Sequence, residues 1–218
     1  MKIFVVGKKT NKYMAFDNIR EHFYIDEPHT GDNIDELNPY YCELTGLYYL
    51  WKNCKDDVVG LEHYRRYFVD GKRKLLSEEK INDILKSNDI ICADFDSMLT
   101  RCTLEDRFNR PACSVGTMKL ELRIVKDIMK IYHPEMYDDF EKYLKQKYHY
   151  QFNMFICKKK LIDEYCEFLF TMLKPISDKM LDKIKKRSIG FLGEILLFTF
   201  WVQQKKLLVY EVSPAVFK

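Results

Sequence analysis

The chain has 218 residues, enough to bury a substantial core, and we expect one domain over residues 1–218. Hydrophobic residues make up 47% and charged residues 32%, which excludes an intrinsically disordered chain. The formal net charge of +3 is too small for a typical nucleic-acid-binding protein, so we expect no nucleic-acid partner.

Three further features bear on the cellular compartment. The longest apolar run, residues 195–202, is too short to span a bilayer and no secretory signal is recognisable, so we expect a cytoplasmic protein. Lysines cluster at 158–160, 183–187 and 205–206; such runs are usually solvated, but they would also suit peripheral contact with the anionic inner membrane. The seven cysteines lack metal-binding spacing and are expected to be reduced thiols.

The first predicted element is a strand over residues 2–6, a near-continuous apolar run closed by Gly7. Residues 8–37 have weak periodicity and are predicted to form a loop. A turn-forming polar cluster lies within that loop: Thr30, Gly31, Asp32 and Asn33. The short side chains of Thr30, Asp32 and Asn33 suit hydrogen bonds to a sugar or a nucleoside, although any tight turn uses the same residue types.

A helix is predicted over residues 38–53, because Asn38 is a good capping residue and proline is favoured at the first helical position. Its apolar residues recur at helical spacing: Tyr41, Leu44, Leu47, Tyr48 and Trp51. A strand over residues 57–61 follows, with the continuous apolar character of a strand covered on both faces. Gly60 would permit the close approach of a neighbouring backbone.

A polar, doubly basic turn follows this strand directly: Glu62, His63, Tyr64, Arg65 and Arg66. Ligands of open α/β sheets bind beyond the carboxyl ends of the strands. Two adjacent arginines at that place would grip a phosphate or diphosphate through forked, charge-assisted hydrogen bonds. The alternative is a solvated basic turn in which the histidine and the tyrosines only pack.

A second helix, capped by Ser77, leads to a predicted strand over residues 89–93, which ends in Asp94-Phe-Asp96. This Asp-x-Asp form holds a divalent metal in many sugar-nucleotide enzymes. The alternative is an ordinary exit from a strand into a turn. Residues 97–115 are polar and irregular, which is typical of a binding loop or lid.

The C-terminal half is predicted to contain helices at 118–131, 134–147, 161–173 and 194–205, the third ended by Pro175, and strands at 151–157 and 207–211. Asn153 is polar among apolar neighbours and must be hydrogen-bonded if buried, either to a ligand hydroxyl or to nearby backbone. Glu194 lies near the start of an apolar helix, where it would act as a general base or complement the helix dipole. The nucleophile-elbow, Walker and dinucleotide glycine motifs are absent from the sequence.

Segments in one order along the chain carry a resemblance to a known family. They are Thr-Gly-Asp-Asn-Ile (30–34), Asn-Pro-Tyr-Tyr-Cys-Glu-Leu-Thr (38–45) with Trp-Lys-Asn (51–53), Gly-Leu-Glu-His-Tyr-Arg-Arg-Tyr-Phe (60–68), and Phe-Asn-Met-Phe-Ile (152–156) with Gly-Phe-Leu-Gly-Glu (190–194). The chain resembles a bacterial family encoded in capsule, exopolysaccharide and lipopolysaccharide loci, catalogued as a domain of unknown function and regarded as glycosyltransferase-like. The His-Tyr-Arg-Arg-Tyr-Phe block is its most specific element.

The resemblance implies a GT-A-like α/β fold: a three-layer α/β/α single domain with a mostly parallel mixed sheet that binds a nucleotide-sugar at the carboxyl ends of its strands. Related sugar transferases carry a metal-binding Asp-x-Asp after a strand, whereas this chain has Glu62-His63-Tyr64 there. A divalent metal (Mn or Mg) therefore stays an alternative with no ligand assigned. Arg65 and Arg66 would neutralise the diphosphate in its place.

The resemblance also implies roles for individual residues. Glu194 becomes the favoured base, with His63 as a helping hydrogen-bond donor. Contacts to the donor would come from Thr30, Gly31, Asp32, Asn33, Glu62, Tyr64, Arg65 and Arg66, and contacts to the acceptor from Asn153 and Met154.

The leading hypothesis is a glycosyltransferase that moves a sugar from a nucleotide-sugar to a hydroxyl of a lipid-linked surface polysaccharide. The first alternative is a non-catalytic nucleotide-sugar-binding subunit of a polysaccharide assembly complex. The second is a metal-dependent phosphate-processing enzyme that uses Asp94 and Asp96.

Overall fold

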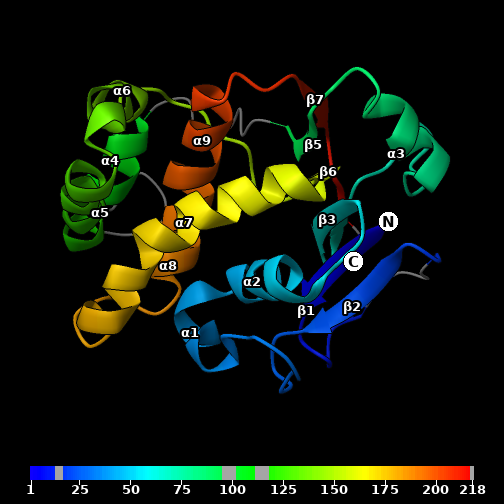
Figure 1. Ribbon diagram of the computed structural model, residues 1–218, viewed down its shortest axis with the longest axis horizontal. Helices are drawn as coiled ribbons and strands as arrows, with labels where there is room; N and C mark the ends of the chain where they lie inside the picture. The colour runs from blue at the N-terminus through cyan, green and yellow to red at the C-terminus, as the bar shows by residue number, and fades with distance from the viewer. Residues whose placement is uncertain (13–16, 95–101, 111–117, 217–218) are drawn as a thin grey trace.

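The computed structural model describes residues 1–12, 17–94, 102–110 and 118–216. Within these residues, eight strands form one sheet, and Figure 1 shows most of them. Six lie side by side in the order β2 (Arg20–Tyr24), β1 (Lys2–Gly7), β3 (Val58–His63), β6 (Phe155–Lys158), β5 (Ile90–Ala93) and β7 (Val209–Val212). Two short strands, β4 (Arg66–Tyr67) and β8 (Ala215–Val216), extend the sheet beyond the end of β3.

The sheet is mixed, as predicted, but parallel pairs do not predominate in the part of the chain that the structure describes. Strand β1 is parallel to both β2 and β3, and β5 is parallel to β7. Strand β6 runs antiparallel to both of its neighbours. Because β6 is antiparallel to both β3 and β5, these two strands run in the same direction as each other and as β1. The carboxyl ends of β1, β3 and β5 therefore lie on the same side of the molecule.

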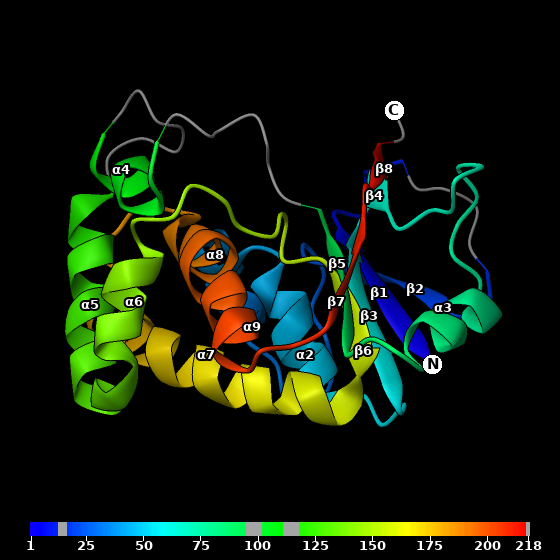
Figure 2. The same ribbon diagram turned by 90° about the horizontal axis from the view of Figure 1, so that it is seen from above.

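Helices cover both faces of the sheet, which gives the expected three layers (Figure 2). Helix α3 (Glu78–Ile84) covers one face, and α2 (Leu44–Asn53), α7 (Lys159–Met180) and α9 (Thr199–Gln204) lie on the other. A further helical group stands outside this second layer: α4 (Leu104–Asn109), α5 (Lys119–Tyr132), η4 (Pro134–Met136) and α6 (Tyr137–Tyr143). The main hydrophobic core fills the space between the sheet and these helices.

Helix α7 continues through Pro175, so the prediction that this proline ends the helix is wrong. Proline removes one helical hydrogen bond and normally bends or breaks the helix. Here the apolar face of the helix extends past the proline: Met172, Leu173 and Ile176 are fully buried. Burial of that face outweighs the local preference of the proline.

Three other predicted boundaries are wrong at places that matter for the site. The predicted helix 38–53 is divided by Cys42, with a φ of 53°, into α1 (Asn38–Tyr41) and α2. The predicted loop 8–37 contains strand β2 and the short helix η1 (Asp35–Leu37). The predicted strand 151–157 begins only at Phe155, because Phe152 and Asn153 adopt left-handed backbone angles.

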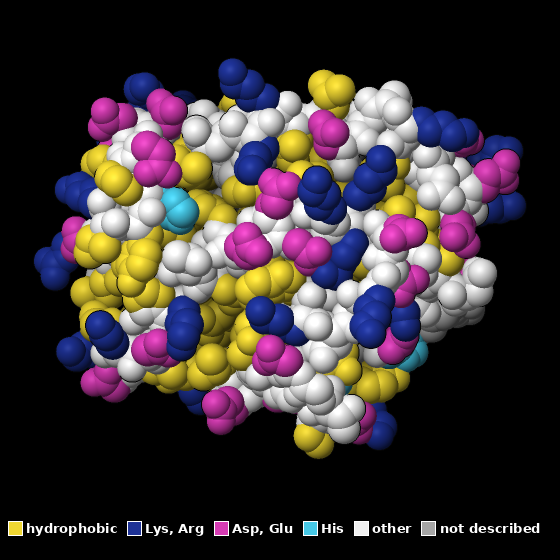
Figure 3. Space-filling model, in the orientation of Figure 1, with side chains coloured by type: hydrophobic (Ala, Val, Ile, Leu, Met, Phe, Trp, Pro, Cys, Tyr) yellow, Lys and Arg dark blue, Asp and Glu magenta, His cyan; other side chains and the backbone are white. Residues whose placement is uncertain are grey.

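Other expectations have mixed outcomes. A side chain at Gly60 would come 2.9 Å from the Phe155 carbonyl oxygen, which confirms the close approach predicted there. Five described cysteines are free thiols, but Cys102 is disulfide-bonded, which corrects the prediction that all seven are reduced. On the face shown in Figure 3, basic and acidic side chains are interspersed. Within the described residues, no helix is both long and apolar enough to cross a membrane.

Candidate functional site

A cavity of about 680 Å³ lies at the carboxyl ends of β1 and β3. Residues just after both strands line it, including Lys8 and the turn from His63 to Arg66. Its opposite wall comes from α1, from Arg187 at the start of α8 (Ser188–Phe191), and from Glu194. The fold thus builds the cavity at the carboxyl ends of the strands, where the sequence predicted a ligand site.

Charged side chains of both signs line this cavity. Four of them are cationic: Lys8, Arg65, Arg66 and Arg187. Two are carboxylic acids, Glu43 and Glu194. The excess of cations favours an anionic ligand, and guanidinium groups suit phosphate oxygens in particular.

The turn after β3 presents its two arginines differently. Arg66 pairs through its backbone with His63 and with Val216 of β8, and its guanidinium lies over the Phe152 ring with a carbon-to-centroid distance of 4.1 Å. The Arg66 side chain is half-buried, whereas Arg65 is exposed and lies 5.5 Å from the Tyr64 ring centroid. Arg66 is therefore the better fixed of the two cations.

His63 lines the cavity, but its N–H group is already used. Nε2 lies 2.7 Å from the carbonyl oxygen of Phe152, and because a carbonyl oxygen only accepts, Nε2 carries the proton. Burial is the main cause that lowers the pKa of His63, assisted by Arg66 and Arg65 and opposed by Glu43. A neutral ring with Nε2–H is expected at neutral pH, so His63 holds Phe152 in place rather than donating to a ligand.

Glu194 lies in η5 (Leu192–Phe198), a π-helical stretch that continues α8 and leads into α9. π-Helical segments widen the helix and occur frequently at functional sites. The carboxylate accepts a hydrogen bond of 3.0 Å from the backbone N–H of Phe152. Glu194 is not in the first turn of the continuous helix, which begins at Ser188, so the explanation by a helix dipole loses its geometric basis.

The environment of Glu194 favours its protonated form. Burial is the largest cause that raises its pKa to about 7, and the neighbouring Glu43 is the next. The Phe152 N–H group, Arg66 and Arg187 act in the opposite direction. Although the side chain keeps some accessible surface, it is screened well enough to exchange a proton near neutral pH.

Glu62 lies in β3 beside His63, but its side chain points elsewhere. Its carboxylate is fully buried and accepts hydrogen bonds from Arg20 Nε at 2.7 Å and Nη2 at 3.1 Å. The same carboxylate accepts a third bond, of 2.9 Å, from the Phe68 backbone N–H. The structure therefore does not bring Glu62 to the cavity; it anchors the turn that carries the arginines.

The four polar residues from Thr30 to Asn33 do not line the cavity either. Their turn is fixed to the end of α2, where the side-chain amide of Asn53 donates to the Asp32 carbonyl at 2.8 Å. The Tyr48 hydroxyl donates to the Asp32 carboxylate at 3.0 Å, and the Asn33 amide donates to backbone carbonyls within the turn. These bonds are those of a tight turn whose polar groups bond within the protein, which is the alternative that the sequence left open.

The two predicted acceptor contacts lie behind the cavity wall. Met154 is fully buried in the core on the α3 side of the sheet. Asn153 is 2% exposed, and its amide donates to the Glu43 carboxylate at 2.7 Å. The partner of this buried asparagine is thus a side chain, where the sequence predicted a ligand or backbone.

Sequence reasoning did not single out three residues of this site: Lys8, Glu43 and Arg187. Glu43 lies within the quoted Asn-Pro-Tyr-Tyr-Cys-Glu-Leu-Thr segment, which was the available signal. Arg187 lies in a basic run that looks like a solvated face. Its left-handed backbone, with a φ of 68°, and the bond from its N–H to the Pro39 carbonyl place it at the cavity.

The proposed Asp-x-Asp metal motif finds limited support. Asp96 lies outside the described residues, and Asp94 accepts a hydrogen bond from the Ser213 hydroxyl. Asp94 follows β5 at the correct edge of the sheet, but it does not line the cavity. In the described ranges, no group of three or more His, Cys, Asp or Glu residues could hold a metal ion.

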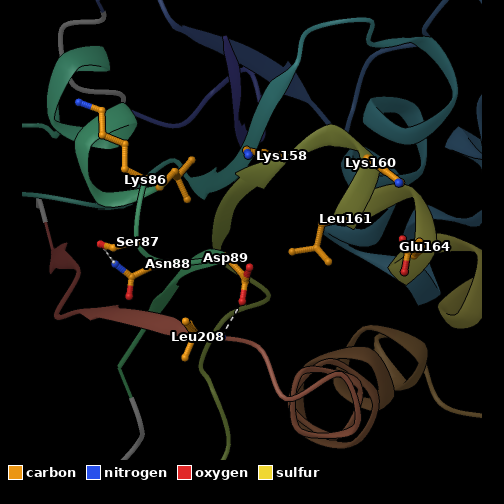
Figure 4. Close-up of a pocket in the computed structure, with 10 residues that line it drawn as sticks. Lys86, Ser87, Asn88, Asp89, Lys158, Lys160, Leu161, Glu164 and Leu208 are labelled. Carbon is orange, nitrogen blue, oxygen red and sulfur yellow. Dashed lines mark hydrogen bonds between the residues drawn. The ribbon is translucent and has the colours of Figure 1, made fainter.

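A second cavity, of about 450 Å³, opens at the opposite edge of the sheet (Figure 4). Its three lysines, Lys86, Lys158 and Lys160, are exposed. The Asp89 carboxylate accepts a bond of 2.8 Å from the Leu208 backbone N–H. These features lack the buried, proton-exchanging carboxylate of the first cavity. We therefore assign the functional site to the cavity that contains Glu194.

Comparison with solved structures bears on the fold of the chain. The apo structure of WbbM, a bifunctional glycosyltransferase, superposes with a TM-score of 0.84 and 23% identity. The match covers 100% of this chain and 45% of that chain, so this chain spans less than half of the length of WbbM. The fold is GT-A-like, as predicted.

Two further comparisons concern the sequence. A search of curated proteins gives no match. Residues 1–206 match the model of a family described as a domain of unknown function, DUF4422. Because this match covers almost the whole chain, the protein belongs to the DUF4422 family.

Proposed function

We propose that the protein is a glycosyltransferase that transfers a sugar from a nucleotide-sugar to a hydroxyl group of a glycan. The observation that carries the proposal is one cavity in which the Glu194 carboxylate, with a pKa of about 7, shares the wall with four cationic side chains. Sugar transfer needs both parts: cations for the diphosphate leaving group and a base for the attacking hydroxyl. The GT-A-like fold supports the same reaction class.

The cations would stabilise the leaving group. As the bond between the anomeric carbon and the phosphate oxygen breaks, the electron pair stays on the diphosphate, where negative charge develops. Arg66, held over the Phe152 ring, and Arg65 would meet that charge from the β3 side, and Arg187 would meet it from the helical side. Fixed donors aimed at developing charge lower the barrier without a reorganisation cost.

Glu194 would accept the proton. The acceptor oxygen forms the new bond to the anomeric carbon, and its proton passes to the Glu194 carboxylate. A base with a pKa near the working pH combines a useful ionised fraction with a useful affinity for the proton. Direct displacement with this single base would invert the anomeric centre, whereas a retaining course would need a further group on the opposite face of the sugar.

The acceptor would be a lipid-linked surface polysaccharide, and the protein would work in the cytoplasm at the inner membrane. The resemblance of the quoted segments to a family from polysaccharide loci supports this finer assignment. Exposed lysines such as Lys158 and Lys160 would suit the anionic membrane surface.

Release of nucleoside diphosphate tests the proposal. Wild-type protein is incubated with UDP-, GDP- and dTDP-hexoses and a lipid-linked glycan acceptor, beside Glu194→Gln and the control Glu79→Gln, which changes an exposed glutamate of α3. We expect acceptor-dependent release by the wild type and the control, and a loss of about 10²-fold or more in Glu194→Gln. Binding of a nucleotide-sugar without release would instead identify a non-catalytic binding subunit.

A further inference from the structure

The cavity contains a second carboxylate that the proposed reaction does not use. Glu43 precedes α2 and lines the cavity together with Glu194. Both carboxylic residues also line a narrow recess of about 20 Å³, together with Cys42 and Arg187. Two acids that share so small a space interact strongly through their charges, because little water fits between them.

The backbone at Phe152 and Asn153 connects this acid pair. Both residues adopt left-handed angles, with φ values of 68° and 51°. In this conformation the Phe152 N–H donates to Glu194 at 3.0 Å, and the Asn153 side-chain amide donates to Glu43 at 2.7 Å. One short turn therefore holds both carboxylates.

The Asn153 side chain is committed to this contact. It is 2% exposed, and its amide nitrogen must face Glu43, because a carboxylate oxygen only accepts. Its own oxygen is buried with no donor among the described residues. A buried polar atom left without a partner opposes folding. Asparagine suits the left-handed backbone here, and its amide in addition holds the Glu43 carboxylate.

We propose that Glu43 is a positioning residue for Glu194: the Asn153 amide fixes the Glu43 carboxylate in the recess, and its negative charge governs when Glu194 takes a proton. The consequence for catalysis rests on the proposed function, whereas the coupling between the two carboxylates does not. The charged groups that face Glu194 come from three sides: Glu43 before α2, Arg66 in β4 and Arg187 before α8. Further titratable groups line the same cavity, among them the Cys42 thiol and the His63 ring. Of the three charged groups that face Glu194, only Glu43 favours the protonated form.

The test measures the titration of Glu194 directly. Protein labelled with ¹³C at the glutamate carboxyl carbon is titrated by NMR, and the Glu194 signal is assigned by its loss in Glu194→Gln. In Glu43→Gln the new side chain can still accept the bond from Asn153, so the geometry is kept and only the charge is removed. We expect the Glu194 midpoint to fall by on the order of one pH unit.

Two variants accompany this measurement. Asn153→Gly keeps the left-handed backbone but removes the amide, so Glu43 is released and the Glu194 midpoint falls by less than in Glu43→Gln. Glu79→Gln makes the same chemical change on α3, an exposed helix on the other face of the sheet, and leaves the midpoint unchanged. A Glu194 midpoint that does not move in folded Glu43→Gln overturns the proposal.

Kinetics supply the second readout. If the protein transfers sugars, the acid limb of kcat/KM against pH shifts in Glu43→Gln by the same amount as the NMR midpoint. If Glu43 had a structural role alone, Glu43→Gln would lower activity without shifting the acid limb of the pH profile. If no nucleotide-sugar is turned over but the NMR midpoint falls, the positioning role of Glu43 stands and the proposed function fails. If nucleotide-sugar is turned over but the Glu194 midpoint does not move, the proposed function stands and the positioning role of Glu43 fails.

Discussion

Glu62 and Arg20 form a fully enclosed ion pair across the sheet, with two hydrogen bonds of 2.7 Å and 3.1 Å. The pair links β2 to the carboxyl end of β3, and the third bond to Glu62, from the Phe68 N–H, closes the turn that carries Arg65 and Arg66. Arg20 also pairs with Asp17 through Nη1, and Glu62 is the fully enclosed one of these two acidic partners. The position of the cavity arginines therefore depends on a carboxylate that never meets the ligand.

We predict that Glu62→Ala costs about 3 to 5 kcal/mol of unfolding free energy, because the buried Arg20 guanidinium loses its enclosed partner and keeps only the partly exposed Asp17 as an ion pair. Urea denaturation measures this cost. The exposed pair Lys86–Asp83 is the control, and Asp83→Ala should cost far less, because solvent screens that pair. In the double variant Arg20→Met/Glu62→Leu, most of the stability should return. Equal costs in Glu62→Ala and Asp83→Ala would contradict this account.

A second prediction concerns stability against pH. The folded state raises the pKa of Glu194 from its ordinary value of 4.5 to about 7, so between these values the folded protein binds more protons than the unfolded chain. The contribution of Glu194 to stability is therefore full below this window and is lost as the pH rises through it. Glu194→Gln removes the effect. Relative to wild type, the variant should gain about 1 to 3 kcal/mol between acidic and mildly alkaline pH.

Chemical denaturation at several pH values checks this prediction, and the same variant should have lost its transfer activity. A more stable but inactive protein is the expected signature of a site residue kept at the expense of stability. A stability difference between Glu194→Gln and wild type that stays constant across the window would show that Glu194 titrates normally.

A third prediction separates the two arginines. Arg66 is half-buried against Phe152, whereas Arg65 is exposed to solvent, which screens its charge. Arg66→Ala should lower the rate of diphosphate release by about 10²- to 10³-fold, and Arg65→Ala by less. Arg66→Lys should restore little, because an ammonium group neither stacks on the ring in the same way nor forks to two oxygens. Unchanged turnover in both alanine variants would remove the proposed diphosphate role.

Several parts of this arrangement could be predicted from the sequence. The apolar run of β3 and the abrupt polar turn after it are local features, so they placed His63, Arg65 and Arg66 at the edge where ligands bind. The helix and strand patterns gave the elements of the fold, and the quoted family segments gave its class. The local pattern alone left two interpretations of Glu194, because a helix-start acid looks the same, and the family resemblance made it the favoured base.

The remaining parts depend on contacts between distant segments. The burial of Glu62 follows from Arg20, which lies in a strand that the sequence did not reveal. The left-handed turn at Phe152 has no glycine to signal it, and it interrupts what looks like a regular strand. Glu43 becomes a cavity residue only because Cys42 breaks the helix and turns α1 away from α2.

The last prediction concerns the packing that sets Glu194 in place. Gly193 lies against Leu44 of α2, and a side-chain carbon on Gly193 would come 2.8 Å from the Leu44 Cδ1 atom. Leu44 is fully buried, so it has little room to move. Gly193→Ala should therefore push η5 away from α2, with a cost of about 1 to 3 kcal/mol, and displace the neighbouring Glu194 from the Phe152 N–H.

We expect Gly193→Ala to lower sugar transfer about 10²-fold or more, since small displacements of reacting groups are costly. Gly71→Ala is the matched control, because nothing lies within 4 Å of the added carbon. Shortening the obstructing side chain should relieve the clash, so Leu44→Ala/Gly193→Ala should be more stable than the sum of the single changes predicts. Strict additivity in that cycle would show that Gly193 does not hold η5 against α2.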